Sequence, residues 1–165
     1  MASISKYVTK GYGQVEPNHL SAQRNGKIYA QLPAVASLKQ IENGMFVKYD
    51  LAAGNVKLDG EGEWMLVFSE EKVYGDRESR KDFVMTTENQ IRGVIVPRCL
   101  KTDIGDIYTT NMVADGEYSA EDKLTVDAAT GVLKAAGDAT DFIWQVVKTT
   151  TMPDGQKAVK LVRIA

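Results

Sequence analysis

A chain of 165 residues with a formal net charge of −2 has the size of one domain, or of one domain with an arm. Its 44% hydrophobic and 25% charged residues are ordinary for a globular protein, and no apolar run approaches the roughly 20 residues of a membrane-spanning helix. The near-balanced charge argues against a nucleic-acid-binding domain, and a single cysteine excludes an internal disulfide. The first residues lack the apolar core of a signal peptide, which favours synthesis in the cytosol.

Residues 1–33 are expected to form an extended N-terminal arm. Glycine, proline and asparagine interrupt the apolar runs, and the one strand-like stretch, residues 27–32, ends at Pro33. Residues 1–39 carry five basic side chains against Glu16 alone, whereas the remainder of the chain is acidic. This charge fits either an arm that binds an acidic protein surface, with tyrosines supplying buried contact area, or a solvated polar leader. The first alternative gives the predicted partner-binding residues, which are Lys6, Tyr7, Lys10, Tyr12, Arg24, Lys27 and Tyr29.

The body, residues 34–165, contains the same turn pattern twice. Residues 50–54 and 127–131 both consist of an aspartate, three further residues and a glycine, and each follows an alternating apolar run. An aspartate accepts hydrogen bonds from backbone N–H groups two or three residues later, and glycine takes the left-handed conformation that ends a four-residue hairpin loop. We therefore predict two hairpins, closed by Gly54 and Gly131.

Apolar residues occupy both faces of two strand-like runs, residues 64–68 and 142–147. A strand with two apolar faces lies between two layers of structure, so Trp64 and Trp144 are expected in the core. A further turn at residues 153–155 joins the second run to another strand. Together these signals predict a mainly β fold, a small antiparallel barrel or sandwich built from hairpins.

Three other segments of the body have distinct expectations. Residues 34–40 are the one candidate for a short helix, ended by the Asn43-Gly44 pair. Residues 94–96 predict a short strand that stops at Pro97. Residues 70–82 mix acidic and basic side chains, which is typical of an exposed loop or short helix.

The sequence contains few candidates for catalytic or metal-binding residues. One histidine, His19, and one cysteine, Cys99, cannot make a zinc site, and neither lies in a nucleophile–base motif. Arg98 would lower the pKa of the Cys99 thiol, but a small residue at a strand end is the simpler interpretation. The carboxylates of residues 59–63 resemble the start of a calcium loop, except that Trp64 stands where such a loop requires glycine. We predict a protein without enzyme activity, cofactor or metal site.

Three segments together resemble the auxiliary or decoration proteins of tailed-bacteriophage heads, and the likeness covers roughly residues 41–165: residues 41–50 (IENGMFVKYD), 105–111 (GDIYTTN) and 124–133 (LTVDAATGVL). The resemblance implies a small β-rich virion protein, made in the host cytoplasm and attached in many copies to the capsid exterior. Its partner would be the major capsid protein, whose subunits it bridges, with other copies of itself as a further candidate. The resemblance implies no catalysis, no cofactor, and no nucleic-acid, membrane or small-molecule partner.

A fibre-base or host-surface module that binds a carbohydrate or a receptor is the alternative function. Such a module needs exposed aromatic side chains next to Asp, Asn or Gln on loops. The sequence offers two candidates, Tyr74 near Asp76 and Tyr118 near Asp115.

Overall fold

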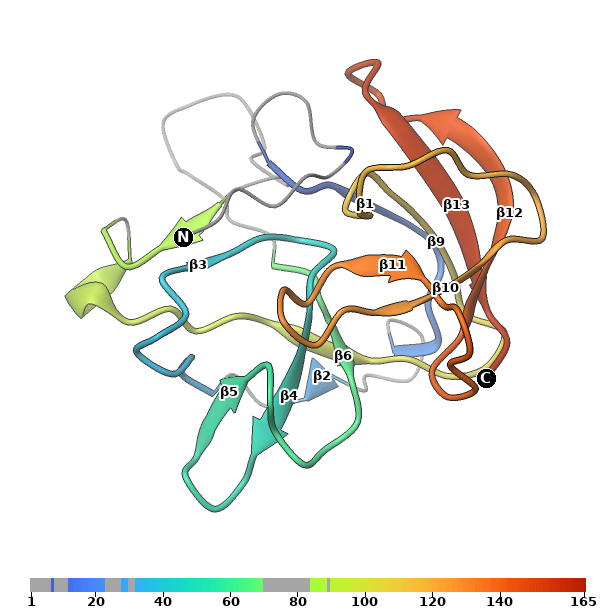
Figure 1. Ribbon diagram of the computed structural model, residues 1–165. Coiled ribbons are helices and arrows are strands. Elements are labelled where there is room, and N and C mark those ends of the chain that lie inside the picture. The colour runs from blue at the N-terminus through green and yellow to red at the C-terminus, as the bar shows by residue number, and fades with distance from the viewer. Residues whose placement is uncertain (1–6, 8–11, 23–27, 30–31, 70–83, 89) are drawn as a thin grey trace.

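The computed structural model describes residues 7, 12–22, 28–29, 32–69, 84–88 and 90–165, and in these residues the chain is mainly β (Figure 1). Among the described residues, Ser21 and Ala22 are α-helical, and η1 (Ile91–Gly93) is a short 3₁₀ turn. None of their helices is long and apolar enough to cross a membrane.

Six antiparallel strands form the larger sheet. The long β12–β13 hairpin lies at its centre, joined by the predicted turn at residues 153–155, where Gly155 has a φ of 85°. The strand order is β1 (Val15–His19), β9 (Ile107–Thr110), β13 (Lys157–Arg163), β12 (Trp144–Thr151), β10 (Lys123–Val126) and β11 (Leu133–Ala135).

A second sheet has five strands, and a third has two. The five-stranded order is β2 (Ile28–Tyr29), β8 (Cys99–Lys101), β6 (Met65–Val67), β4 (Phe46–Asp50) and β5 (Asn55–Lys57). The small sheet pairs β3 (Gln40–Ile41) with β7 (Met85–Thr86). Neither larger sheet closes on itself in the described chain, so the sandwich prediction is confirmed and a closed barrel is not formed.

An aromatic cluster joins the two larger sheets. Trp144 of β12 is fully buried, with its ring 4.9 Å from that of Tyr108 and 6.0 Å from that of Phe46 (centroid distances). Phe46 comes from β4 of the five-stranded sheet, and Leu66 of β6 belongs to the same core. This contact holds the layers face to face.

A second core lies on the other side of the five-stranded sheet. Met65 and Val67 of β6 enter it together with Val47, while Leu66 and Phe68 enter the first core. The prediction that this strand is covered on both faces is therefore confirmed. Trp144 is in the core as predicted, whereas Trp64 is only partly buried and lies beneath Lys48, whose Nζ is 4.7 Å from the ring centroid.

Both predicted glycine turns are confirmed. Gly54 closes the β4–β5 hairpin with a φ of 66°, and Gly131 closes the β10–β11 hairpin with a φ of 73°. The turn aspartates act as predicted: Asp50 accepts from the Ala53 N–H at 2.9 Å, and Asp127 from the Ala129 N–H at 3.2 Å.

The predicted helix over residues 34–40 is wrong. The Ala34 N–H donates to the Ile95 carbonyl at 2.7 Å, and the Val35 N–H donates to the Val56 carbonyl at 3.0 Å. These long-range bonds hold residues 34 and 35 against other segments; a turn at residues 36–37 follows, closed by the Leu38 N–H donating to the Val35 carbonyl at 2.9 Å, and the segment ends in β3. Residues 94–96 are also not a regular strand, although their side chains alternate between exposed and buried.

Candidate interaction surfaces

The outer face of the six-stranded sheet consists of side chains that point away from the aromatic core. One row crosses five strands, because Ile107 pairs with both His19 and Val162, and Gln145 pairs with both Val162 and Lys123. A second row runs beside it. The second row consists of Glu16, Thr109, Lys160 and Lys148. We call the two rows, together with Val147 at the irregularity in β12, the outer sheet face.

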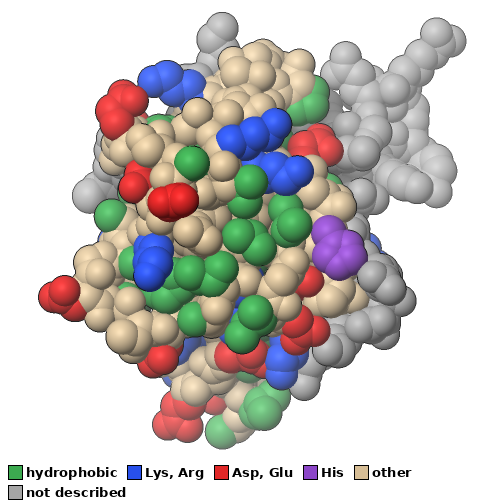
Figure 2. All heavy atoms as spheres, turned by 90° about the vertical axis from the view of Figure 1, so that its right-hand side faces the viewer, with side chains coloured by type: hydrophobic (Ala, Val, Ile, Leu, Met, Phe, Trp, Pro, Cys, Tyr) green, Lys and Arg blue, Asp and Glu red, His purple; other side chains and the backbone are tan. Residues whose placement is uncertain are grey.

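The centre of the outer sheet face is apolar. Val147 is 44% exposed, and Ile107 and Val162 are half-buried. Ile164 and Ile104 extend the apolar surface beyond the end of β13, and Ile104 is 71% exposed. Figure 2 shows hydrophobic side chains gathered in the middle of one face of the molecule, with the chain's one histidine, His19, at the margin.

Basic side chains surround this apolar centre. Lys123, Lys148 and Lys160 lie in its two rows, with Glu16 as the one acidic member. None of these lysines forms an ion pair with a described residue. The outer sheet face is therefore basic in a chain that is acidic as a whole.

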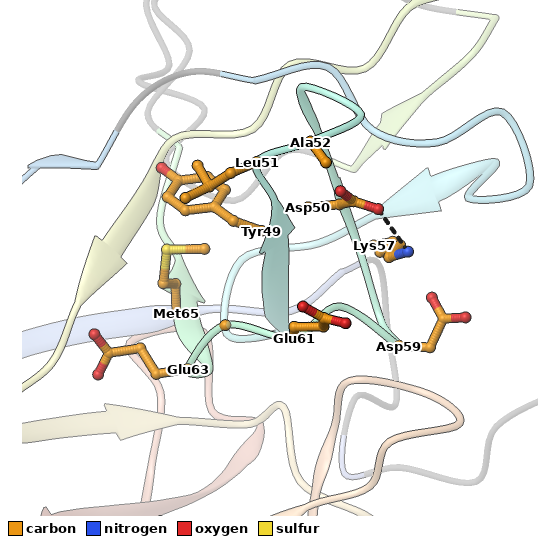
Figure 3. Close-up of a pocket in the computed structure, with 10 residues that line it drawn as sticks. Tyr49, Asp50, Leu51, Ala52, Lys57, Asp59, Glu61, Glu63 and Met65 are labelled. Atoms are coloured by element: carbon orange, nitrogen blue, oxygen red, sulfur yellow. Dashed lines mark ion pairs between the residues drawn. The ribbon is translucent and has the colours of Figure 1, made fainter.

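A pocket of about 760 Å³ lies beside the β4–β5 hairpin. Figure 3 shows Tyr49, Leu51 and Met65 on one side of it and the carboxylate of Asp59 on the other. We call it the hairpin pocket; its lining residues are Tyr49, Asp50, Leu51, Ala52, Lys57, Asp59, Glu61, Gly62, Glu63 and Met65.

Two of the four carboxylates of the hairpin pocket are neutralised by lysines. Asp50 pairs with Lys57 at 2.8 Å, and this bond holds the pKa of Asp50 below its ordinary value and raises the pKa of Lys57. Glu63 pairs with Lys101. Asp59 and Glu61 are exposed and form no ion pair with the described residues, which leaves the mouth of the pocket acidic.

A third exposed apolar site is formed by Val94 and Val96, which are 43% and 41% exposed. These valines flank Ile95, whose carbonyl accepts the Ala34 N–H. Tyr29 of β2 pairs with Cys99, three residues after Val96, so two described residues of the N-terminal part, Tyr29 and Ala34, lie against this segment.

The predicted partner-binding residues lie partly within the described chain. Lys6, Lys10, Arg24 and Lys27 lie outside the described residues. Tyr29 is described through its backbone pairing in β2, and Tyr12 is half-buried. Tyr7 is 6% exposed, and its hydroxyl donates to the Gly116 carbonyl at 2.8 Å. Burial, followed by the charges of Glu117 and Asp115, raises the pKa of Tyr7. The Tyr7 side chain is thus packed against the body.

Buried polar bonds fix residues 12–14 to the body. The Gly13 N–H donates to Glu42 at 2.7 Å, and the Gln14 N–H donates to the Asn111 side-chain oxygen at 2.6 Å. The Asn111 amide in turn donates to the Tyr12 carbonyl at 3.3 Å. Val15, Leu20 and Ala22 then enter the first core. The boundary of a separate arm at residue 33 stays a prediction, but residues 12–22 lie against the body.

The other sequence candidates have mainly structural positions. Cys99 is fully buried at the start of β8, and burial raises the pKa of its thiol to about 12. His19 is exposed at the end of β1. No group of three or more His, Cys, Asp or Glu side chains in the described chain is arranged to hold a metal ion.

Tyr118, the aromatic candidate for carbohydrate binding, is half-buried. Its hydroxyl donates to the Ala114 carbonyl at 2.8 Å, and its ring meets the edge of Tyr7 at a centroid distance of 5.3 Å. Burial, followed by the charges of Tyr7 and Asp115, raises its pKa to about 12. The other candidate, Tyr74 with Asp76, lies outside the described residues, as does the whole of residues 70–82.

Comparison with family models, with curated proteins and with solved structures gave no match for this chain.

Proposed function

We propose that this chain is a non-enzymatic structural protein of a phage virion. It binds the outside of the capsid and stabilises it by bridging major capsid protein subunits. Such a protein is made in the host cytoplasm and ends on the virion exterior, with the major capsid protein and other copies of itself as partners.

The observation that supports this proposal is the spread of exposed apolar side chains over three separate places. Leu51 is 80% exposed at the β4–β5 hairpin, Ile104 is 71% exposed beside the outer sheet face, and Val94 is 43% exposed on a third segment. Neighbouring exposed apolar side chains, such as Val94 and Val96 on either side of Ile95, mark interaction sites. A bridging protein needs several such sites, because it touches more than one neighbour at once.

The segments that resemble decoration proteins meet at one point of the fold. Met45, Met112 and Val132 form a small buried cluster, and the Phe46 N–H donates to the Gly131 carbonyl at 2.7 Å. Met45 and Val132 belong to two of the three resembling segments, and Met112 directly follows the third. The resemblance thus rests on the framework that joins the sheets, which supports a shared type of fold rather than a shared binding residue.

Val94 and Val96 are the proposed contact with the capsid. Two of the predicted basic residues, Arg24 and Lys27, closely precede β2 in the sequence, and Tyr29 of β2 pairs with Cys99, three residues after Val96. Apolar contact area would supply most of the affinity there, and the cations would speed encounter with an acidic capsid.

The test is to add the purified protein to capsids of its phage prepared without it, and to measure occupancy by co-sedimentation and capsid stability by thermal disruption. We expect saturable binding and a raised disruption temperature. The double variant V94S/V96S should bind at least tenfold more weakly, because a loss of roughly 1.4 kcal/mol of apolar contact energy corresponds to a tenfold change in affinity. The control is A139S, a change at an exposed residue between β11 and β12. Absence of binding by the wild-type protein would overturn the proposed function.

A further inference from the structure

The outer sheet face and the hairpin pocket both combine apolar with charged side chains, and their charges have opposite signs. The face places Lys123, Lys148 and Lys160 around an apolar centre, whereas the pocket places Asp59 and Glu61 at the mouth of an apolar wall. We propose that the outer sheet face of one copy binds the hairpin pocket of a second copy.

The charges of both surfaces are available for this contact. Lys148 and Lys160 have no ion pair within the described chain, and the same holds for Asp59 and Glu61. Opposite potentials on two surfaces favour encounter and fix the orientation of the partners, while like charges oppose other pairings. Two outer sheet faces would repel each other, and so would two hairpin pockets. The complementary pairing is therefore face to pocket.

Apolar contacts give this pairing a centre. Leu51 projects from the hairpin loop at 80% exposure, and Val147 is exposed in the middle of the outer sheet face. Placing Leu51 against Val147 removes both side chains from water and brings the pocket carboxylates toward the lysines of the face. An apolar centre with a charged rim is the usual anatomy of a protein interface.

The contact is heterologous, because it joins two different surfaces. The outer sheet face belongs to the six-stranded sheet, and the pocket lies on β4 and β5 of the five-stranded sheet. One copy can therefore bind a neighbour through each surface, which yields rings or open chains of copies. Exposed ion pairs contribute little each, so the contact is weak in solution and gains from any arrangement that holds copies close together.

Purified full-length protein is sufficient for the test, and capsids are not required. Sedimentation velocity over a concentration series at low salt should show a weight-average mass that rises above that of the monomer. About 0.5 M NaCl should return the protein to monomer, because salt screens exposed charges. A protein that stays monomeric at every concentration at low salt overturns this inference, while leaving the capsid-binding proposal to its own experiment.

Two charge-reversal variants identify the surfaces. K148E/K160E makes the face acidic, and D59K/E61K makes the pocket basic; each variant alone should stay monomeric. An equimolar mixture of the two should associate again, since the acidic face of one variant then meets the basic pocket of the other. The matched control K39E/R92E changes the net charge equally at two exposed cations outside the six-stranded sheet and the hairpin pocket, and it should associate like the wild type.

The apolar centre is tested by L51S and V147S. Both residues are exposed, so folding should be unchanged by circular dichroism, and each variant should associate roughly tenfold more weakly. Association that persists in D59K/E61K but disappears in K148E/K160E would indicate a symmetric contact between two faces, and it would overturn the proposed pairing. A mixture of the two charge-reversal variants that stays monomeric would overturn it as well.

Discussion

The two glycine turns share a backbone conformation but have different surroundings, and this difference yields a sharp prediction. Gly54 and Gly131 have φ values of 66° and 73°. A methyl group added at Gly54 would meet no atom within 4 Å. The same group at Gly131 would lie 2.5 Å from the Phe46 carbonyl oxygen and 3.0 Å from Leu58 Cδ2. We therefore expect Gly131→Ala to destabilise the protein much more than Gly54→Ala.

The expected loss follows from two separate effects. The left-handed conformation costs an alanine ~1–2 kcal/mol at either position. Overpacking adds ~1–3 kcal/mol at Gly131 alone, because the clashing Phe46 oxygen is backbone of β4 and cannot move aside like a side chain. The Phe46 N–H also donates to the Gly131 carbonyl at 2.7 Å, so a shift there strains a bond between the two sheets. The free energy of unfolding should thus fall by ~1–2 kcal/mol for Gly54→Ala and by ~2–5 kcal/mol for Gly131→Ala.

Urea unfolding measures both losses. Tryptophan fluorescence reports the transition because Trp144 is fully buried in the core between the sheets. With a denaturant slope of ~1–3 kcal/mol per molar urea, the midpoints of the two variants should differ by roughly 1 M. Gly54→Asn is the control, since asparagine tolerates the left-handed conformation better than alanine, and it should stay closer to the wild type. Equal losses for the two alanine variants would refute the role assigned to the Phe46 carbonyl.

Four further outcomes are expected. Trp144→Ala should cost ~3–5 kcal/mol in urea unfolding, because it empties the centre of the aromatic cluster. Asn111→Ala leaves the Gln14 N–H without its partner and should cost ~1–3 kcal/mol in urea unfolding, with faster hydrogen exchange at that amide; unchanged exchange would contradict this bond. The Cys99 thiol, with its pKa raised by burial to about 12, should resist a thiol reagent at neutral pH until the protein is unfolded; rapid labelling of the native protein would contradict its burial. Burial opposes ionisation of Asp127, but the Ala129 N–H and Lys134 outweigh it and lower its pKa, so its stabilising effect is present above about pH 4 and lost on acidification. Asp127→Asn should therefore unfold more easily than the wild type at pH 7, and the difference between their urea midpoints should shrink as the pH is lowered below about 4.

The hairpins and the doubly covered strand were predictable because their signals are local. A glycine after an aspartate and three loop residues specifies a turn through its own backbone conformation, as Gly54 and Gly131 confirm. The alternation in residues 64–68 correctly predicted that the strand lies between two layers, since Leu66 and Met65 enter different cores. The same logic was less accurate in residues 142–147. Val147 lies at an irregularity in the pairing of β12, and it is exposed instead of covered.

The interaction surfaces were harder to predict, because they depend on which strands become neighbours. Lys160 and Val162 alternate with the buried Val159 and Leu161, so the sequence holds a signal that one face of this strand meets solvent. That Lys148 lies beside Lys160 follows only from the pairing of β12 with β13. The hairpin pocket was hard to predict for the same reason. In the sequence, residues 59–63 resemble only an incomplete calcium loop, and that they line one pocket with Leu51 is seen only in the folded hairpin.

The N-terminal segment shows why weak apolar periodicity is not the same as separation from the body. Residues 12–14 are held by Glu42 and Asn111, which lie 29 and 97 residues further along the chain than their bonded partners Gly13 and Gln14. Such polar bonds leave no periodic pattern in the sequence. Val15, Leu20 and Ala22 fill the first core, so deleting residues 1–26 would remove core side chains together with the cations. A loss of capsid binding after that deletion would not distinguish a missing contact from an unfolded body. Replacement of Lys6, Lys10, Arg24 and Lys27 by glutamine changes the charge and keeps the core, and it is therefore the change that tests whether these cations bind a partner.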